Sequence, residues 1–321
     1  MIQSVAPVDP RAKSSVLLSL IVPVYNEELC VHRFVQAVEN TFKSQRQINL
    51  ELIFINDGSD DGTLETLLKV QQDKPYIRII DLSRNFGKES ALSAGLDTCC
   101  GEIAVPIDVD LQDPVELIPI MIKKWREGYD MVLAERTDRK SDGFLKRNCA
   151  SMFYRLHNKF SRPNIPENVG DFRLMDRIVI DALNNLSENN RYMKGLFAWV
   201  GFKTTKIQYK RLARQDGNSK FSTRRLISLA VDGFTGFSTL PIRIWTYIGM
   251  AVTLVSITFA VAVAVEVTIY GADVPGYASL VVLISFLGGV QLTSIGFIGE
   301  YLSKTYIESK SRPIYLIRRI Y

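Results

Sequence analysis

Histidine and cysteine are scarce in this chain of 321 residues, and their scarcity excludes several kinds of site. The chain has two histidines and four cysteines, and no pair of cysteines has the Cys-x-x-Cys spacing of zinc ligands. A zinc site is therefore not expected. We expect the cysteines to be reduced and mostly buried residues of a cytosolic domain. They are Cys30, Cys99, Cys100 and Cys149.

Two common glycine-rich phosphate-binding motifs are also absent. No Gly-x-Gly-x-x-Gly follows the first apolar run, which argues against a dinucleotide-binding oxidoreductase. Gly87 and Lys88 are adjacent, but the glycine and the serine or threonine that complete a P-loop are missing around them. The net charge of +5 is modest. It is weak evidence for a nucleic-acid partner, and none is expected.

Short apolar runs alternate with amphipathic stretches over the first 135 residues. The runs predict buried strands at residues 17–24, 52–55, 77–80, 103–105 and 131–134. Apolar residues at helical spacing predict helices between them. The alternation predicts an α/β fold, a Rossmann-like and mostly parallel sheet. Ligands bind at the carboxyl ends of such strands, where polar residues occur in this chain: Tyr25, Glu27, Asp57, Arg84, Asn85, Asp108, Asp110, Gln112 and Arg136.

The most acidic of these strand ends is the segment 107–114. Asp108 and Asp110 are two residues apart, so their side chains are expected to project to the same side. Two neighbouring carboxylates favour a hard divalent cation, Mg²⁺ or Mn²⁺, that also binds a substrate phosphate. The alternative is a polar loop that caps the next helix, with Asp113 as N-cap and Pro114 at the first helical position.

The apolar content is highest near the C-terminus. Residues 244–265 and 277–298 carry no charge, and each run has about the 20 residues that span a bilayer. Lys and Arg flank the two runs, whereas the connection 271–276 has neither. This pattern predicts a two-helix transmembrane hairpin in a multi-pass protein of the cytoplasmic (inner) membrane, with the catalytic domain and both termini in the cytoplasm.

These observations predict five segments. Residues 1–15 would form a flexible arm and residues 16–222 the catalytic domain. Cationic residues between 211 and 225 predict contact with anionic membrane lipids, followed by an amphipathic interface helix at 223–241. The transmembrane helices would occupy 242–303 and a cytoplasmic tail 304–321.

Five motifs together resemble the family 2 glycosyltransferases of GT-A fold. They lie at residues 23–27 (PVYNE), 56–59 (NDGS), 83–88 (SRNFGK), 108–113 (DVDLQD) and 170–173 (GDFR). In particular, the chain is similar to polyprenyl-phosphate glycosyltransferases, namely the dolichol-phosphate mannose synthase group and the bacterial undecaprenyl-phosphate glucosyltransferases. The resemblance implies inverting transfer of one sugar, glucose from UDP-glucose by default, to a polyprenyl phosphate. It also implies a homo-oligomer. The QxxRW motif of polymerising relatives is absent, which favours single-sugar transfer.

The resemblance also implies roles for individual residues. The nucleotide-sugar would contact Pro23, Tyr25, Glu27, Asp57, Asn85 and Asp108. The metal ligands would be Asp108, Asp110 and Gln112. The catalytic set would be Asp171, Asp110 and Arg136. The lipid phosphate or the diphosphate would meet Arg147, Arg173 and Lys220.

Three alternatives remain open on the sequence. The acceptor could be a polysaccharide or a protein instead of a lipid phosphate. The sugar could be mannose, an N-acetylhexosamine or a modified arabinose. A non-enzymatic nucleotide-sugar-binding protein is disfavoured because the set Asp108, Asp110 and Gln112 is intact.

Overall fold

The structure is a computed structural model of the whole chain. It describes residues 11, 14–137, 166, 168–189, 191–210, 240–270 and 276–321. The predicted interface helix at 223–241 therefore lies almost entirely outside the described residues, as do Arg147, Lys220 and most of the predicted flexible arm.

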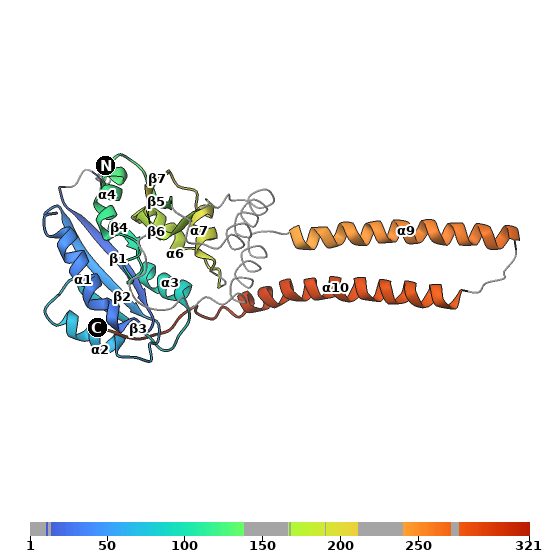
Figure 1. The fold of residues 1–321 in the computed structure, drawn as a ribbon, viewed down its shortest axis with the longest axis horizontal. Helices are drawn as coiled ribbons and strands as arrows, with labels where there is room; N and C mark the ends of the chain where they lie inside the picture. The colour runs from blue at the N-terminus through green and yellow to red at the C-terminus, as the bar shows by residue number, and fades with distance from the viewer. Residues whose placement is uncertain are drawn as a thin grey trace, which may run out of the picture.

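An eight-stranded sheet forms the centre of the described part (Figure 1). Its strand order is β7-β5-β6-β4-β1-β2-β3-β8. The strands are β1 Val16–Val24, β2 Ile48–Asn56, β3 Ile77–Leu82, β4 Ile103–Pro106, β5 Met131–Arg136, β6 Val169–Asp176, β7 Thr204–Tyr209 and β8 Ile317–Ile320. Parallel pairs join β3, β2, β1 and β4, and also β5 and β7, whereas β6 and β8 pair antiparallel with their neighbours. The Rossmann-like sheet is as predicted.

Helices cover both faces of the sheet, because successive residues of the central strands point to opposite sides. In β1, Leu20 and Val22 pack toward α1 Glu28–Phe42, α2 Thr63–Gln71 and α4 Ile118–Arg126. Ile21 faces the opposite layer, with α3 Lys88–Thr98, α6 Arg177–Asn184 and α7 Met193–Trp199. These three side chains of β1 are fully buried, as expected for a strand with helices on both faces.

The order of the strands fixes where a ligand can bind. From β1 the chain builds β2 and β3 on one side and then returns to place β4 on the other side of β1. The ends of β1 at Val24 and β4 at Pro106 therefore flank a topological switch point, the usual position of a ligand crevice. Since β6 is antiparallel to β4, the first residues of β6 lie beside the carboxyl ends of β1 and β4.

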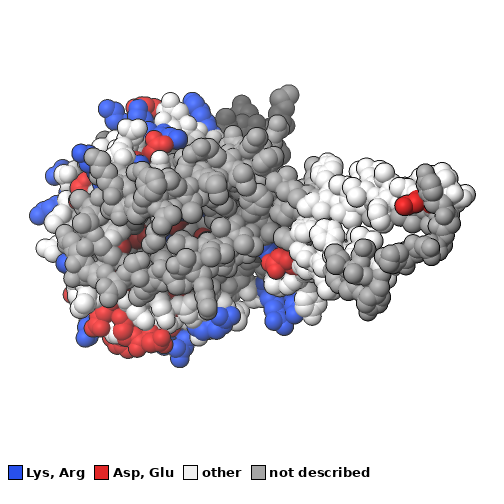
Figure 2. Space-filling view, turned by 45° about the vertical axis from the view of Figure 1, so that its right-hand side comes forward, with Lys and Arg blue, Asp and Glu red and all other residues white. Residues whose placement is uncertain are grey.

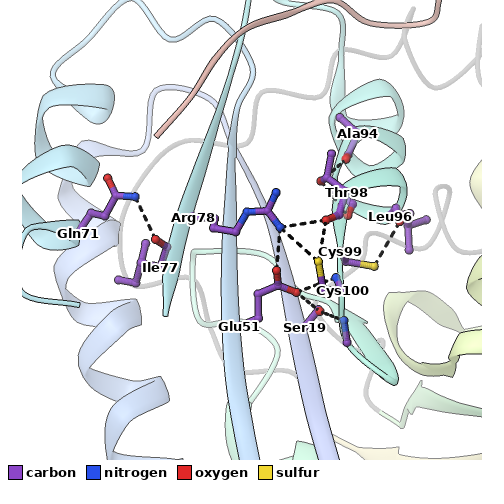
Figure 3. Close-up of polar contacts among 12 residues, drawn as sticks. Ser19, Glu51, Gln71, Ile77, Arg78, Ala94, Leu96, Thr98, Cys99 and Cys100 are labelled. Carbon is purple, nitrogen blue, oxygen red and sulfur yellow. Dashed lines mark hydrogen bonds and ion pairs between the residues drawn. The ribbon is translucent and has the colours of Figure 1, made fainter. Parts of the chain in front are cut away.

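Toward the opposite ends of the strands, one carboxylate links several strands by hydrogen bonds (Figure 3). Glu51 at the start of β2 accepts hydrogen bonds from Ser19 of β1, from Arg78 of β3 at 2.9 Å and from the Cys100 amide at 2.9 Å. The Ser19 hydroxyl in turn accepts from the amide of Gly101 at 2.8 Å. Glu51 therefore holds β1, β2 and β3 together toward the ends that lie away from the switch point.

Two long helices, α9 Leu240–Tyr270 and α10 Tyr277–Ser309, project side by side from the body that the sheet and its covering helices form (Figure 1). Figure 2 shows Lys and Arg interspersed with Asp and Glu on the body, and few charges on the projection. Among the described residues, no helix has the combination of length and mean hydropathy that crossing a membrane requires. The predicted transmembrane hairpin is therefore wrong, and so is the predicted multi-pass placement in the cytoplasmic membrane.

The last residues of the chain complete the sheet. Strand β8 pairs antiparallel with β3, and the Tyr321 amide donates to the Ile79 carbonyl at 2.9 Å. The Tyr315 hydroxyl donates to Asp97 of α3 at 2.6 Å. Near the end of α10, the Glu308 carboxylate accepts from the backbone amide of Asn189 at 2.9 Å. These contacts fix residues 308–321 against the body that the sheet and its helices form.

Candidate functional site

The loops after β1 and β2 are joined by hydrogen bonds between backbone and side chains. The Asp60 amide donates to the Asn26 side chain at 2.8 Å, and the Asn26 amide donates to the Ser59 hydroxyl at 3.1 Å. The Glu27 amide donates to the Thr63 hydroxyl at 3.0 Å. Asn26 has a positive φ of 54°, a conformation that asparagine tolerates better than most residues. These bonds hold the backbone that carries Glu27 at the switch point.

Asp57 joins the loop after β2 to the loop after β3. Its two carboxylate oxygens accept from the amides of Phe86 at 2.7 Å and Gly87 at 2.9 Å, and the residue is only 3% exposed. Gly58 has a φ of 64°, and a Cβ there would lie 2.5 Å from the backbone of residues 84–85. Burial raises the pKa of Asp57, against the opposing effects of the two amides and Arg84. Sequence reasoning assigned Asp57 to the nucleotide and missed this structural role.

Lys88 lies between two of the predicted site carboxylates. Its Nζ is 2.6 Å from Oδ1 of Asp108 and 3.2 Å from Oδ2 of Asp171. The register of β4 on β6 pairs Ala104 with Met175, and the same register carried further sets Asp171 opposite Asp108. Partial burial alone would lower the pKa of Lys88, but the two carboxylates outweigh burial and raise it. Sequence reasoning met Lys88 in the incomplete P-loop and in the motif at residues 83–88 but gave it no role. Its place at the start of the helix after β3 was the available signal.

Asp171 and Arg173 lie on the first half of β6 and face charged neighbours. Burial alone would raise the pKa of Asp171, but Lys88, Lys194 and Arg173 lower it overall. Arg173 is 3% exposed, donates to the Gly170 carbonyl at 2.7 Å and has its guanidinium 3.8 Å from the ring centroid of Phe197. Burial lowers the pKa of Arg173 to about 10. The predicted contact of Arg173 with a phosphate stays a prediction, since its described contacts are internal.

Arg136 is the last residue of β5 and belongs to a second polar group near the switch point. Its Nε donates to the Tyr209 hydroxyl at 3.2 Å, and the Tyr209 hydroxyl donates to Asp113. Burial alone would lower the pKa of Arg136, but Tyr209, Asp113 and Asp108 raise it overall. Asp113 is 3% exposed and is not a helix cap. The prediction of Asp113 as N-cap is wrong, because Pro114 takes that place before the 3-10 turn η2 Val115–Leu117.

The acidic loop after β4 offers oxygen donors to a cation. The Gln112 amide donates to Oδ1 of Asp110 at 3.1 Å, and Leu111 between them has a φ of 56°. Across the described residues, no group of three or more His, Cys, Asp or Glu side chains is placed to hold a metal ion. The predicted set contains two carboxylates and an amide, so by chemistry it fits a hard divalent cation. Asp108 already has Lys88 as a cationic partner.

Most of the predicted site residues fall within the described part, and they come from the strand ends around the switch point. Pro23 lies within β1, and Tyr25 follows it, with its hydroxyl 3.5 Å from Asp60. Asn85 is exposed in the loop after β3. Lys88 connects Asp108 with Asp171, and the pKa of Arg136 reflects the charge of Asp108. The individual roles of these residues stay predictions.

Comparison with known proteins gives the same family along most of the chain. Residues 19–183 match the family described as "Glycosyl transferase family 2". A relative from Escherichia coli K12, named "Prophage bactoprenol glucosyl transferase homolog", is 48% identical over 94% of this chain and 99% of its own length. The "Bactoprenol glucosyl transferase" of Shigella phage SfV is 49% identical over 94% of this chain and 98% of its own.

Among solved structures, glucosyl-3-phosphoglycerate synthase from Mycobacterium tuberculosis is similar over 69% of this chain and 78% of its own. The TM-score is 0.47 and the identity 18%, too distant to support an argument about function. The sequence gives the family match over residues 19–183 and relatives that are 48–49% identical over nearly their full length. The structure gives the site at the switch point. The two lines of evidence agree, and the chain belongs to glycosyl transferase family 2.

Proposed function

We propose that the chain transfers a single glucose from UDP-glucose to a polyprenyl phosphate such as undecaprenyl phosphate, with inversion at the anomeric carbon. The observation that carries the proposal is near full-length similarity to relatives named for glucosyl transfer and for bactoprenol. The site is compatible with this chemistry, because the acidic loop and Lys88 lie at the switch point of the sheet. Membrane lipids and a second copy of the chain remain predicted partners.

The reaction needs negative charge to be stabilised on the departing diphosphate. A divalent cation, Mg²⁺ or Mn²⁺, would supply part of this stabilisation when held by Asp108, Asp110 and Gln112. Lys88 and Arg136 add positive charge at the same end of the strands, and their raised pKa values keep both side chains protonated. With the cation bound, these positive charges would face the departing diphosphate.

The acceptor supplies its own nucleophile. A phosphate monoester has a second pKa of about 6, so its oxygen is largely ionised at neutral pH without help from a base. An in-line attack forms the new bond from carbon to oxygen while the bond to the diphosphate breaks, and this inverts the anomeric centre. Asp171, with its lowered pKa, is suited to orienting cations such as Lys88. It is poorly suited to accepting a proton.

The test is a transfer assay with short-chain polyprenyl phosphate and a panel of labelled UDP- and GDP-sugars. We expect transfer of glucose from UDP-glucose, loss of transfer with EDTA, and a large loss in Asp110→Asn, about a hundredfold or more for an electrostatic contribution of this kind. Asp73→Asn is the matched control, because Asp73 is exposed before β3 at the opposite edge of the sheet. Transfer only to a polysaccharide or protein acceptor would reject the proposed acceptor, and full activity of Asp110→Asn would reject the metal site.

A further inference from the structure

Tyr209, the last residue of β7, is a buried tyrosine to which the proposed reaction gives no role; it is 6% exposed. The parallel register of β7 on β5 pairs Tyr209 with Arg136, so both side chains leave the sheet on the same face. The Tyr209 ring packs edge-on against Phe172 of β6, with ring centroids 6.1 Å apart. Its carbonyl accepts from the Thr137 amide at 2.9 Å and from the Thr137 hydroxyl at 3.1 Å. Ring and backbone are therefore both held, and the hydroxyl has a defined position.

The Tyr209 hydroxyl connects a cation to an anion. Nε of Arg136 donates to it at 3.2 Å, and the hydroxyl itself donates to Oδ1 of Asp113. Asp113 is 3% exposed in the loop after β4, and the same Oδ1 is 3.9 Å from Nη2 of Arg136. Burial and the charge of Asp113 raise the pKa of Tyr209 against the effect of Arg136, so the hydroxyl keeps its proton at neutral pH. A guanidinium only donates and a carboxylate only accepts, so the hydroxyl is the group that can link them in this order.

The contacts of Arg136 use one edge of its guanidinium. Nε and Nη2 form the edge that Tyr209 and Asp113 engage. Nη1 and Nη2 form the other edge, whose parallel N–H groups suit a bidentate contact with a phosphate. The Arg136 side chain is 27% exposed, so a ligand can reach it.

Backbone packing brings this guanidinium next to the candidate site. A Cβ at Gly170 would lie 3.1 Å from Nη2 of Arg136, so the absence of a side chain at residue 170 allows the guanidinium to lie over the start of β6. The next residue, Asp171, has its carboxylate 3.2 Å from Nζ of Lys88. Arg136 therefore lies one residue away from a carboxylate of the candidate site.

We propose that Tyr209, oriented by Asp113, is a positioning residue that holds the guanidinium of Arg136 at the carboxyl ends of the strands, where its Nη1–Nη2 edge binds the diphosphate of the donor. The consequence for the reaction rests on the proposed function. An arginine side chain has many rotamers, and a charge that is already in place when the diphosphate leaves stabilises it without reorganisation. Without the hydroxyl, Arg136 keeps its charge but loses its fixed position.

The position of Arg136 can be tested without an activity assay. In full-length protein with ¹⁵N-labelled arginine, the Nε–H signal of Arg136 is the one that disappears in Arg136→Lys. We expect its exchange with solvent to be about tenfold faster or more in Tyr209→Phe, which removes only the hydroxyl and keeps the ring on Phe172. Tyr76→Phe is the matched control, since the Tyr76 hydroxyl donates to Glu39 at 2.6 Å before β3, and it should leave the signal unchanged. Equal exchange in the wild type and in Tyr209→Phe would overturn the proposal.

A double-mutant cycle on glucose transfer tests the consequence for the reaction. Tyr209→Phe should lower kcat/KM for UDP-glucose about tenfold and leave the KM for polyprenyl phosphate unchanged, because Arg136 serves the donor. In an Arg136→Ala background, Tyr209→Phe should change kcat/KM by less than about twofold, since the group that it positions is gone. Tyr76→Phe should have no effect in either background.

The outcomes separate a positioning role from a purely structural one. A structural Tyr209 would lower kcat/KM by the same factor with and without Arg136, and this result would overturn the proposal. Full activity of Arg136→Ala would overturn it as well. Failure of the proposed function would appear instead as no glucose transfer by the wild type, while the Nε–H signal of Arg136 still responds to Tyr209→Phe.

Discussion

Substitution of Asp57 separates a structural role from a ligand contact. Asp57 accepts the Phe86 amide at 2.7 Å and the Gly87 amide at 2.9 Å, and it is 3% exposed. Asp57→Ala leaves both part-buried amides without their acceptor. Each lost bond to a buried donor costs roughly 1–3 kcal/mol. Removing the buried charge returns part of this cost, since burial raises the pKa of Asp57. We therefore expect Asp57→Ala to lower the free energy of unfolding by about 3 kcal/mol.

The measurement is urea unfolding of the full chain without nucleotide, followed by the fluorescence of the buried Trp125. Hydrogen exchange of a peptide covering residues 86–87 locates the effect. Asp57→Asn keeps one acceptor oxygen but turns an amide group toward a donor, so we expect an intermediate loss of about 1–2 kcal/mol. Asp73→Ala, at an exposed position, should change neither quantity.

A pure ligand contact would give a different result. If Asp57 only bound the nucleotide, Asp57→Ala would unfold within about 0.5 kcal/mol of the wild type, the usual range for substitutions that break no internal contact. The amides of residues 86–87 would stay protected while nucleotide affinity fell. That combination would refute the structural role derived from the two hydrogen bonds.

Two further predictions concern contacts outside the site. Glu51→Gln should destabilise the protein by about 2 kcal/mol at neutral pH, discounted for the partial exposure of Arg78. Burial alone would raise the pKa of Glu51, but its hydrogen bonds lower it, so the stabilisation is present above the unfolded pKa of about 4.3 and is lost as the pH falls through the folded pKa. Denaturant titrations at several pH values should show the difference shrinking in acid, and a pH-independent difference would contradict the assignment. Removal of residues 314–321 takes away β8, so the Ile79 and Ser83 amides should exchange faster and the bare edge of β3 should promote association. Unchanged exchange at Ile79 would show that β8 does not protect this edge.

The central sheet could be predicted from the sequence because parallel strands buried on both faces appear as continuous apolar runs. The outer strands could not. In β7, exposed positions alternate with partly buried ones and polar residues predominate, and β8 has two arginines in four residues. A short strand of this kind pairs because a neighbouring edge is available, and that information lies elsewhere in the chain. The motif at residues 170–173 of β6 was noted in the sequence, but the antiparallel place of this strand beside β4 was not predicted.

The site could be predicted to the level of which strand ends meet. Asp108 and Asp171 were both expected to be functional, and the structure places them on either side of Lys88. The role of Asp57 could not be separated from theirs, because all three are aspartates near strand ends, and Asp113 was wrongly predicted to be a helix cap. Their partners differ: Asp57 faces backbone amides and Asp113 faces a tyrosine hydroxyl. Partners of this kind depend on how distant loops pack, and spacing in the sequence does not record that packing.

The type of partner gives a physical criterion for which of these carboxylates acts in the reaction. The amides that bind Asp57 belong to a loop closely packed against Gly58, so they cannot leave without unfolding it. Asp108 and Asp171 are 31% and 22% exposed at the side chain and share an ammonium group on a flexible stem that is 45% exposed. An ammonium is a point charge that another cation can replace without moving the backbone. Asp108 and Asp171 are therefore the carboxylates whose partner could be replaced without a movement of the backbone, whereas Asp57 holds the loop after β3 in place.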